Sequence, residues 1–298
     1  VGKNTFVVNT DQIKKAINKK TQAIMIPNLL GNVPNWKEIF LIAKKKKIKI
    51  IEDSADTIGY KLNKKNLGRF SDITTNSMYA SHIITGAGFG GIVCFNDKKL
   101  YDKAKLLRGW GRSSAVFNES EGIKKRFSIK VDGIPYDGKY IFHDVGYNFL
   151  PSEISAAFAL EQLKKLSKNI KIRVSNFEKL KTFFSKFPNL FEVPIQLKGL
   201  ITPWLAYPVI IKSKKINRQK LQIFLEKNDI QTRTIFTGNI LRQPIMKKRK
   251  YKKVKNAETN SNFVMKNGIL IGCHQGLKNK DISYIHLTIL KFLKSRSV

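Results

Sequence analysis

The sequence predicts an α/β protein with a mostly parallel sheet in its larger part. The chain has 298 residues, of which 42% are hydrophobic, and this is enough for about two domains with a sizeable core. Up to about Leu166, short apolar segments alternate with helix-like segments. This alternation is typical of a parallel sheet with helices on its faces. A long helical segment then leads into a smaller unit of strands and helices.

The expected elements of the first part follow that alternation. The predicted strands are Ala23 to Pro27, Ile48 to Glu52, Phe70 to Tyr79 and Gly91 to Phe95, and the predicted helices are Asp11 to Asn18, Asn35 to Lys46 and Lys98 to Gly109. Because ligands gather at the carboxyl ends of parallel strands, chemistry is expected at Glu52-Asp53 and at Ser77 to Tyr79.

The second part begins after a long polar stretch, Ser113 to Tyr140, whose length indicates a substrate or dimer loop. Two helices are expected next, Ser152 to Leu166 and Ile170 to Phe187, of which the second would bridge two domains. The remaining predicted strands are Trp204 to Ile211, Thr232 to Phe236 and Gly268 to Gly272, and the remaining helices are Arg218 to Asn228 and Asp281 to Leu293. We therefore expect a large domain at residues 1–166 and a small domain at residues 167–298.

The net charge is strongly positive but dispersed. There are 56 Lys and Arg against 21 Asp and Glu, which gives a formal charge of +35. Lysines run through the whole chain and are not gathered on one basic arm, so neither nucleic acid nor a membrane is the expected partner. Anionic small molecules would still be attracted. A basic, non-catalytic nucleic-acid-binding relic of the fold stays open as an alternative.

Cysteine usage and hydropathy favour a cytoplasmic protein. Cys94 and Cys273 lie in apolar, strand-like contexts without a CxxC partner, so neither a disulfide framework nor a zinc site is expected. No signal peptide opens the chain, and no apolar run reaches the roughly 18 to 20 residues of a membrane span. The chain opens at Val1 as though inside a domain, and an upstream segment is expected.

Two segments carry groups suited to chemistry. Ile50 to Asp56 places carboxylates at the end of a buried strand, where a cationic ring nitrogen would be a natural partner. A helix N-cap is the alternative there. Between Asn76 and Gly91, closely spaced glycines allow the backbone to approach a ligand, and the hydroxyls of Ser77 and Ser81 could cap a phosphate. A glycine-rich turn between strands is the alternative.

Six ordered motifs extend across nearly all of the chain. They are Thr21 to Asn32, Ile51 to Asp53, Ser77 to Gly91, Leu107 to Arg112, Val145 to Asn148 and Ala156 to Leu163. Together they resemble the DegT/DnrJ/EryC1/StrS family of sugar aminotransferases, which are pyridoxal phosphate enzymes. The resemblance implies the aspartate aminotransferase-like fold, fold type I. It also implies that a phosphate-binding Gly-Ser/Thr turn and a ring that stacks on the cofactor precede Val1.

His82 stands where this family normally has the lysine that forms a Schiff base with the cofactor. An imidazole forms no stable imine with an aldehyde. The same change marks a small branch of the family, the 3-dehydratases of nucleotide-linked 4-keto-6-deoxyhexoses. The resemblance thus implies removal of the C3 hydroxyl, as in the synthesis of 3,6-dideoxysugars for O-antigen-type polysaccharides, with His82 as the general base. A 4-keto sugar aminotransferase and a merely structural histidine are the alternatives.

The cofactor implied is pyridoxal phosphate, used as pyridoxamine phosphate, and no metal is expected. Some 3-dehydratases of the branch also hold an iron–sulfur cluster on four cysteines. In this sequence the matching positions are Ala55, Ser114, Val116 and Ile123. The resemblance therefore points to the branch members that work without a cluster.

The resemblance also assigns roles to individual residues. Asp53 matches the carboxylate that pairs with the pyridinium nitrogen, Asp56 a polar residue near the ring hydroxyl, and Ser77 a phosphate ligand. Asn148 matches a residue that reaches the partner subunit's cofactor, so a homodimer is expected. Two further candidates, Arg233 and Arg242, would bind the nucleotide diphosphate or the carboxylate of an amino donor such as glutamate. A solvated face is the alternative for both arginines.

Overall fold

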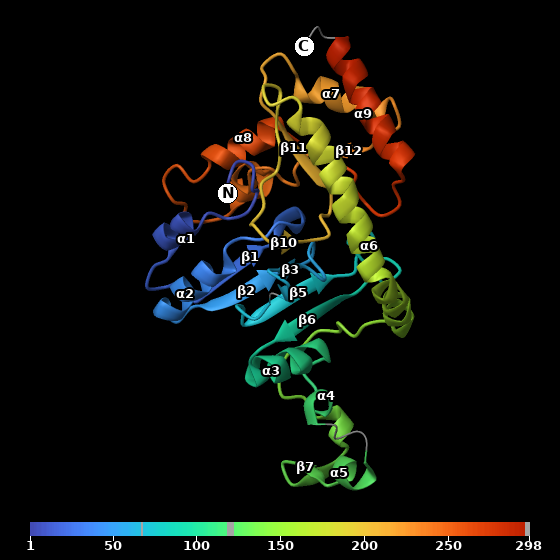
Figure 1. Ribbon diagram of the computed structural model, residues 1–298. Coiled ribbons are helices and arrows are strands. Elements are labelled where there is room, and N and C mark those ends of the chain that lie inside the picture. The colour runs from blue at the N-terminus through green and yellow to red at the C-terminus, as the bar shows by residue number, and fades with distance from the viewer. Residues whose placement is uncertain (67, 118–121, 296–298) are drawn as a thin grey trace.

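The larger part of the chain is built on a four-stranded sheet of order β1-β2-β5-β6 (Figure 1). The computed structural model describes residues 1–66, 68–117 and 122–295. Strands β1 (Ala23–Pro27), β2 (Lys49–Asp53) and β5 (Ile73–Ser77) run parallel, and β6 (Gly91–Phe95) pairs antiparallel with β5. The prediction of a mostly parallel sheet is thus confirmed.

The helices of this part begin where the sequence places polar caps. The helices are α1 (Thr10–Ala16), α2 (Trp36–Lys46) and α3 (Lys98–Arg108), and their N-cap side chains, Asn9, Asn35 and Asp97, accept backbone N–H bonds in the first turn. Helix α2 buries Trp36, Ile39 and Ala43, which belong to one core cluster with Ile26 and Ile50 of the sheet. Apolar residues at three- and four-residue spacing therefore fix which face of α2 meets the sheet.

A single long helix, α6 (Glu153–Ser185), replaces the two helices that the sequence predicted. The prediction was wrong because the intervening residues 167–169 include neither Gly nor Pro. Ser and Asn inside a helix each reduce its stability by only about 0.5 kcal/mol relative to Ala. The second half of α6 buries Phe177, Leu180 and Phe184 in the C-terminal core. Figure 1 shows the helix running from beside the sheet up to that core.

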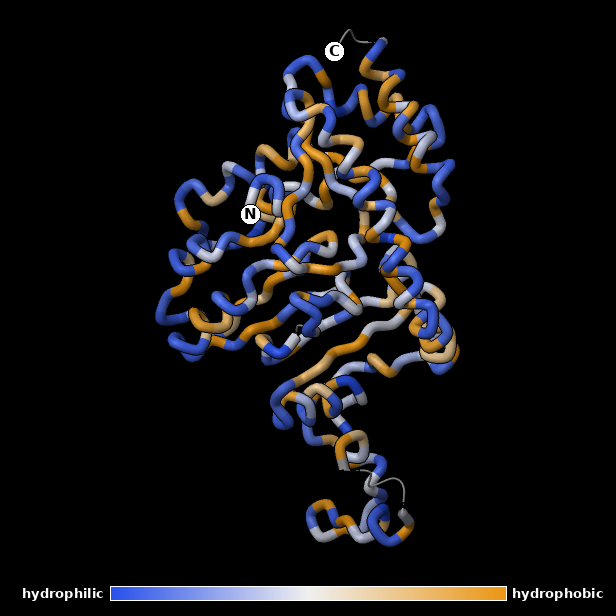
Figure 2. The backbone as a smooth tube through the Cα atoms, in the orientation of Figure 1, coloured by the Kyte–Doolittle hydropathy of each residue, from blue (hydrophilic) through white to orange (hydrophobic). Residues whose placement is uncertain are grey.

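The C-terminal core is built around a second sheet, of order β12-β13-β11-β9, in which all neighbours are antiparallel. Its strands are β9 (Phe191–Glu192), β11 (Tyr207–Ile211), β12 (Thr232–Arg233) and β13 (Gly268–Ile271), and its helices are α7 (Arg218–Glu226), α8 (Thr259–Asn267) and α9 (Asn279–Lys294). Every residue of β11 and β13 is buried. Figure 2 shows the hydrophobic residues concentrated along these strands.

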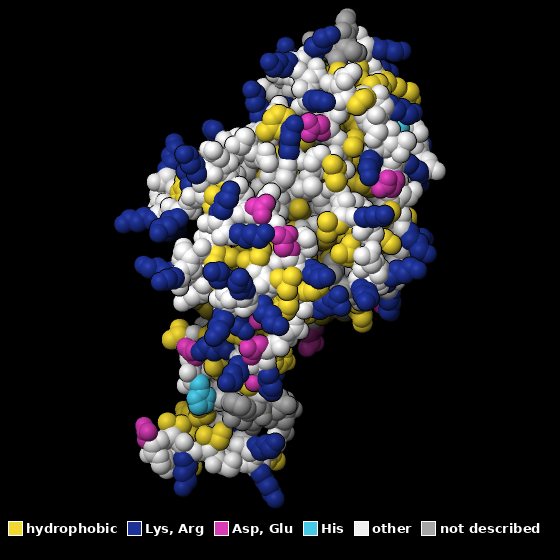
Figure 3. Space-filling view, turned by 60° about the vertical axis from the view of Figure 1, so that its left-hand side comes forward, with side chains coloured by type: hydrophobic (Ala, Val, Ile, Leu, Met, Phe, Trp, Pro, Cys, Tyr) yellow, Lys and Arg dark blue, Asp and Glu magenta, His cyan; other side chains and the backbone are white. Residues whose placement is uncertain are grey.

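Several short elements complete the chain. They are η1 (Leu29–Gly31), the three-stranded sheet of β3 (Lys61–Leu62), β4 (Lys65–Asn66) and β10 (Leu200–Ile201), and the two turns η3 (Ile240–Arg242) and η4 (Pro244–Lys248). Among the described residues, no helix has the length and apolarity needed to cross a bilayer. Figure 3 shows Lys and Arg side chains spread over the whole face in view, as the dispersed sequence charge predicts.

The polar stretch from Ser113 to Tyr140 is more regular than the sequence predicted. Residues 118–121 lie outside the described part of the chain, and the rest of the stretch contains α4 (Ser114–Phe117), α5 (Ile123–Phe127), the hairpin of β7 (Ile129–Val131) and β8 (Ile134–Tyr136), and η2 (Gly138–Tyr140). The hairpin turn uses Asp132 and Gly133, both at positive φ, which is the Asp-Gly turn that matches strand twist. An Arg126–Asp137 ion pair joins α5 to η2. In Figure 1 this segment extends from the lower end of the molecule.

The two cores meet at the turn that follows β1. Leu30 is fully buried in the C-terminal core although it lies in η1, directly after a strand of the larger sheet. Gly31 follows at φ +100°, and a Cβ added there would lie 2.8 Å from the Cα of Trp204. The amide of Leu205 donates to the Leu30 carbonyl at 2.9 Å, and the Thr202 hydroxyl donates to the Gly31 carbonyl at 2.6 Å.

We predict that Gly31→Ala destabilises the protein by about 2–4 kcal/mol, because a left-handed backbone and a clash with backbone atoms add together. Gly133→Ala is the matched control, since Gly133 also has positive φ but no atom within 4 Å of an added Cβ. It should cost only about 1–2 kcal/mol. Urea unfolding of both variants measures the difference, and equal losses would contradict the close packing at Gly31.

Candidate active site

The carboxylate of Glu52, at the end of β2, lies in a cluster of hydrogen-bond donors. It is 0% exposed and accepts from the Asn28 amide at 2.8 Å and the Ser54 hydroxyl at 2.7 Å. The hydroxyls of Tyr60 and Ser71 also donate to it. Burial, together with the neighbouring Glu52 charge, raises the pKa of Tyr60 well above its usual value, so this hydroxyl stays a donor.

The turn that follows Glu52 presents two further carboxylates. Asp53 is half-buried, and its Oδ1 accepts from the amide of Ala55 at 3.1 Å. This bond closes a short turn, so Asp53 is not the N-cap of a helix. Asp56 is 7% exposed, and its Oδ2 accepts from the amide of Leu30 at 2.9 Å. Its other oxygen, Oδ1, lies 3.3 Å from Nδ1 of His82.

His82 is reached from β5 by a tight turn. The Ser77 hydroxyl accepts from the amide of Tyr79 at 3.2 Å, and the amide of His82 donates to the Tyr79 carbonyl at 3.0 Å. The amide of Gly86 returns to the Met78 carbonyl at 2.8 Å. Ser77, His82 and Asp56 thus lie at the edge of the sheet where β2 and β5 end, which is the edge at which the sequence predicted chemistry.

Asn148 lies apart from these residues. It is exposed and forms a β-bridge with Gly109. The neighbouring side chains of Tyr147 and Phe149 are exposed too, and their rings stack at 5.1 Å. Among the described residues, no hydrogen bond joins Asn148 to Asp53, Ser77 or His82.

The two candidate arginines have different surroundings. Arg233 lines a cavity of about 820 Å³ that also includes Ser81, the neighbour of His82, together with His274 and Tyr284 from the C-terminal part. Its Nη1 donates to the carbonyl of Thr232 at 2.7 Å. Arg242 does not line this cavity, and its Nε donates to the side chain of Asn262. The structure therefore brings Arg233, and not Arg242, toward the His82 loop.

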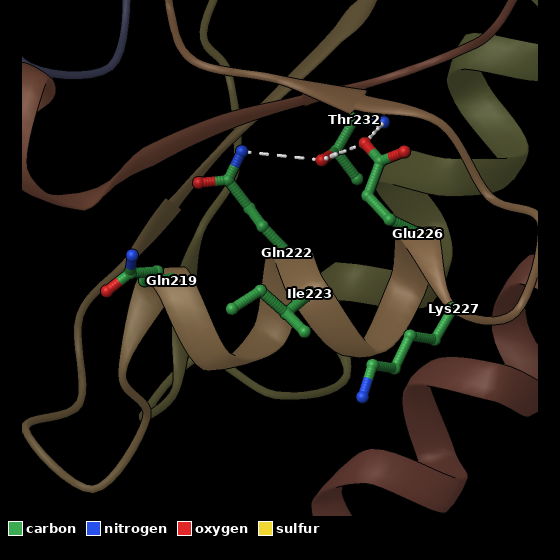
Figure 4. Close-up of a pocket in the computed structure, with 6 residues that line it drawn as sticks. All are labelled: Gln219, Gln222, Ile223, Glu226, Lys227 and Thr232. Carbon is green, nitrogen blue, oxygen red and sulfur yellow. Dashed lines mark hydrogen bonds between the residues drawn. The ribbon is translucent and has the colours of Figure 1, made fainter.

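A separate depression on α7 contains no comparable arrangement (Figure 4). It has a volume of about 460 Å³ and is lined by Gln219, Gln222, Ile223, Glu226, Lys227 and Thr232. The Glu226 carboxylate accepts from the amide and the hydroxyl of Thr232 at 2.6 and 2.8 Å, and these bonds lower its pKa. The Gln222 amide also donates to the Thr232 hydroxyl at 3.3 Å, so these side chains attach α7 to β12.

The edge formed by β2 and β5 fits a pyridoxal phosphate group. Within the described part of the chain, Asn76 Oδ1, on β5, is buried without a hydrogen-bond partner. A buried polar atom without a partner indicates that another group belongs beside it. Asp53 offers a carboxylate for a ring nitrogen and Ser77 a hydroxyl for a phosphate. No cluster of three His, Cys, Asp or Glu side chains suited to a metal occurs among the described residues.

Comparison with known proteins assigns the family. The model of the DegT/DnrJ/EryC1/StrS aminotransferase family matches residues 1–290. The chain belongs to this family. The aspartate aminotransferase-like architecture inferred from the motifs of Asp53, Ser77 and His82 is therefore confirmed.

Three family members are similar over nearly the whole chain. A dTDP-4-dehydro-2,6-dideoxy-D-glucose 3-dehydratase of Saccharopolyspora spinosa is 33% identical over 98% of this chain and 64% of its own length. A GDP-4-keto-6-deoxy-D-mannose 3-dehydratase of Yersinia pseudotuberculosis is 34% identical over 92% of this chain and 68% of its own. A crystal structure of GDP-4-keto-6-deoxymannose-3-dehydratase with a trapped PLP-glutamate geminal diamine has a TM-score of 0.81 at 30% identity, covering 97% of this chain and 72% of that one.

Sequence reasoning missed the Glu52 cluster within this family architecture. Glu52 attracted attention only as a strand end next to Asp53, and its partners Asn28, Tyr60 and Ser71 lie far from one another in the sequence. The one signal was the acid itself, since a carboxylate inside a buried strand requires several donors.

We predict that Tyr60→Phe lowers the free energy of unfolding by about 1–3 kcal/mol, because it leaves a buried carboxylate with one donor fewer. Tyr251→Phe is the control, since Tyr251 is exposed. The free energy of unfolding of Tyr251→Phe should stay within about 0.5 kcal/mol of that of the unmodified protein. Denaturant titration measures both, and a neutral Tyr60→Phe would show that the Tyr60–Glu52 bond is dispensable.

Proposed function

We propose that this chain carries out pyridoxamine-phosphate-dependent C3 dehydration of a nucleotide-linked 4-keto-6-deoxyhexose, in the synthesis of a 3,6-dideoxysugar for an O-antigen-type polysaccharide. The observation that carries the proposal is His82. By the family resemblance it stands where the Schiff-base lysine is normally found, and its imidazole lies 3.3 Å from the carboxylate of Asp56. The 3-dehydratases at 33% and 34% identity support the same reaction.

The residues of the site have separate tasks in this proposal. When bound, pyridoxamine phosphate supplies an amine for the substrate ketone and a ring that withdraws electrons. Asp53 keeps the ring nitrogen protonated, and Ser77 binds the phosphate. His82 takes up and returns a proton at its Nε2 atom, a task suited to an imidazole near neutral pH.

The overall reaction needs an amino donor. Substrate and glutamate would give the 3-deoxy ketosugar, 2-oxoglutarate and ammonia, because oxidation of the donor supplies the two electrons that replace hydroxyl by hydrogen. A PLP-glutamate adduct in the crystal structure of a similar dehydratase supports glutamate as donor. Arg233 is our candidate for an anionic group of substrate or donor, and the cavity that it lines beside Ser81 supports this. Arg242 stays a second candidate without such support.

A homodimer in the cytoplasm completes the proposal. Asn148 is exposed, and so are the large apolar side chains of Val145, Phe149 and Ile154 near it in sequence, at 88, 69 and 79%. A partner subunit that covers these side chains would receive Asn148 at its own cofactor. At a Debye length of about 8 Å, salt screens much of the repulsion between two basic chains.

The alternatives explain less. A sugar aminotransferase of this family would need a lysine at position 82, and the chain has histidine. A nucleic-acid-binding relic would favour one concentrated basic surface, but Lys and Arg are spread over the face in Figure 3.

We predict that no lysine becomes covalently attached to pyridoxal phosphate when the complete protein is treated with borohydride, because residue 82 has no primary amine. His82→Lys should make residue 82 the labelled position and abolish dehydration. Peptide mass spectrometry locates the label, and His143→Lys serves as the control for an exposed histidine. A labelled lysine in the unmodified protein would disprove the role of His82.

We further predict that the purified enzyme contains no iron and turns over without a reductase, because the four cluster positions hold Ala55, Ser114, Val116 and Ile123. Iron and acid-labile sulfide assays on active protein test this. Stoichiometric iron would contradict the cluster-free mechanism.

A further inference from the structure

Asp56 and His82 form a buried pair on the proposed reaction edge. Oδ1 of Asp56 lies 3.3 Å from Nδ1 of His82, and the two side chains are only 9% and 18% exposed. The atoms are within ion-pair distance, although they are not aligned as a hydrogen bond. Polar contacts in enzymes without substrate are often long and tighten only when the substrate binds.

The Asp56 carboxylate is held in place from its other side. Its Oδ2 accepts from the amide of Leu30 at 2.9 Å. Leu30 is itself fixed, because it is fully buried at φ +61° and its carbonyl accepts from the amide of Leu205. Asp56 therefore cannot turn away from His82 without giving up a bond to a rigid turn.

The neighbouring carboxylate of Asp53 has a different environment. Its Oδ1 bonds within its own turn, to the amide of Ala55. Among the described residues, His82 is the one ion-pair partner of Asp56, and Asp53 has none. One carboxylate thus faces the imidazole, and the other is left for the ring nitrogen.

We propose that Asp56 is the positioning residue of His82, fixing the imidazole through Nδ1 so that Nε2 is the atom that exchanges a proton. The inference rests on the proposed function. A carboxylate beside Nδ1 favours the tautomer with the proton on Nδ1 and leaves the lone pair on Nε2. It also stabilises the imidazolium that forms when Nε2 takes up a proton. This role differs from the contact with the ring hydroxyl that the family resemblance implied for Asp56.

The test uses Asp56→Asn, which keeps the shape and an acceptor for the Leu30 amide but removes the charge. In the cofactor-loaded protein labelled with ¹⁵N-histidine, His82 should carry its proton on Nδ1, and the variant should show a mixture of tautomers. The kcat for dehydration should fall about 10- to 100-fold with KM within about twofold. Loss of a signal in His82→Asn assigns His82 among the four histidines.

Asp72→Asn is the matched control. Asp72 also accepts a backbone N–H, from Ile50 at 2.8 Å, and pairs with Lys49 at 2.8 Å, away from His82. It should leave the His82 tautomer and kcat unchanged.

Two results would overturn the inference. One is a proton on Nε2 of His82 in the unmodified protein. The other is an Asp56→Asn variant in which the His82 tautomer is unchanged and only the affinity for the cofactor falls. That result would indicate that Asp56 contacts the ring hydroxyl of the cofactor instead. Because the tautomer is read without turnover, absence of dehydratase activity would refute the proposed function and leave the pairing of Asp56 with His82 to be decided by the spectrum.

Discussion

The buried carboxylate of Glu52 is the constraint on which the rest of the site depends. It lies at 0% exposure, and no Lys or Arg pairs with it among the residues that the structure describes. Burying a neutral polar group without a hydrogen bond costs about 2–7 kcal/mol, and burying an uncompensated carboxylate costs more, so hydrogen bonds must replace its water. Asn28, Ser54 and Tyr60 must therefore converge on it, and this fixes where β1 ends and where the chain turns after β2.

The residues at the end of β1 connect the Glu52 cluster to both halves of the protein. Asn28 accepts from the indole N–H of Trp36 at 2.9 Å, which ties the cluster to helix α2. The next residues form a turn in which the Leu30 side chain packs into the C-terminal core. The backbone amide of Leu30 donates to the Asp56 carboxylate. On the C-terminal side, Trp204 packs on Gly31 and stacks on Phe177 of α6 at 4.3 Å. Helix α6 thus supports the pair of Asp56 and His82 through two layers of contacts.

A buried arginine strengthens this support. Arg173 of α6 is 3% exposed and donates to the carbonyls of Trp204 and Leu205 at 3.0 and 3.3 Å. Burial lowers its pKa, yet a guanidinium keeps its charge over any ordinary pH range. These bonds fix the segment of Trp204 and Leu205, and the Leu205 amide donates to the Leu30 carbonyl. The position of Asp56 therefore depends on residues more than a hundred positions away in the chain.

The sequence predicted the local elements well and the long-range ones poorly. Strand β1 and strand β6 have the predicted bounds, because short β-branched segments between polar turns leave little freedom. The separation of α6 into two helices was wrong because weak helix formers were taken for a break. Chemistry near Asp53 and Ser77 was predictable from the strand ends, whereas His82 was singled out only by the family resemblance. The bond between Leu30 and Asp56 was not, since nothing local connects two residues that lie 26 positions apart.

The backbone around position 82 is held independently of the side chain at that position. The backbone of His82 is fixed by the Tyr79 carbonyl and by the return of Gly86 to Met78, and neither bond involves the side chain. Asp53 and Ser77 are likewise fixed by β2 and β5, independently of residue 82. A different side chain at position 82 would therefore leave the edge formed by Asp53 and Ser77 intact. The carboxylate of Asp56 differs from these groups, because it lies 3.3 Å from the side chain of His82 itself.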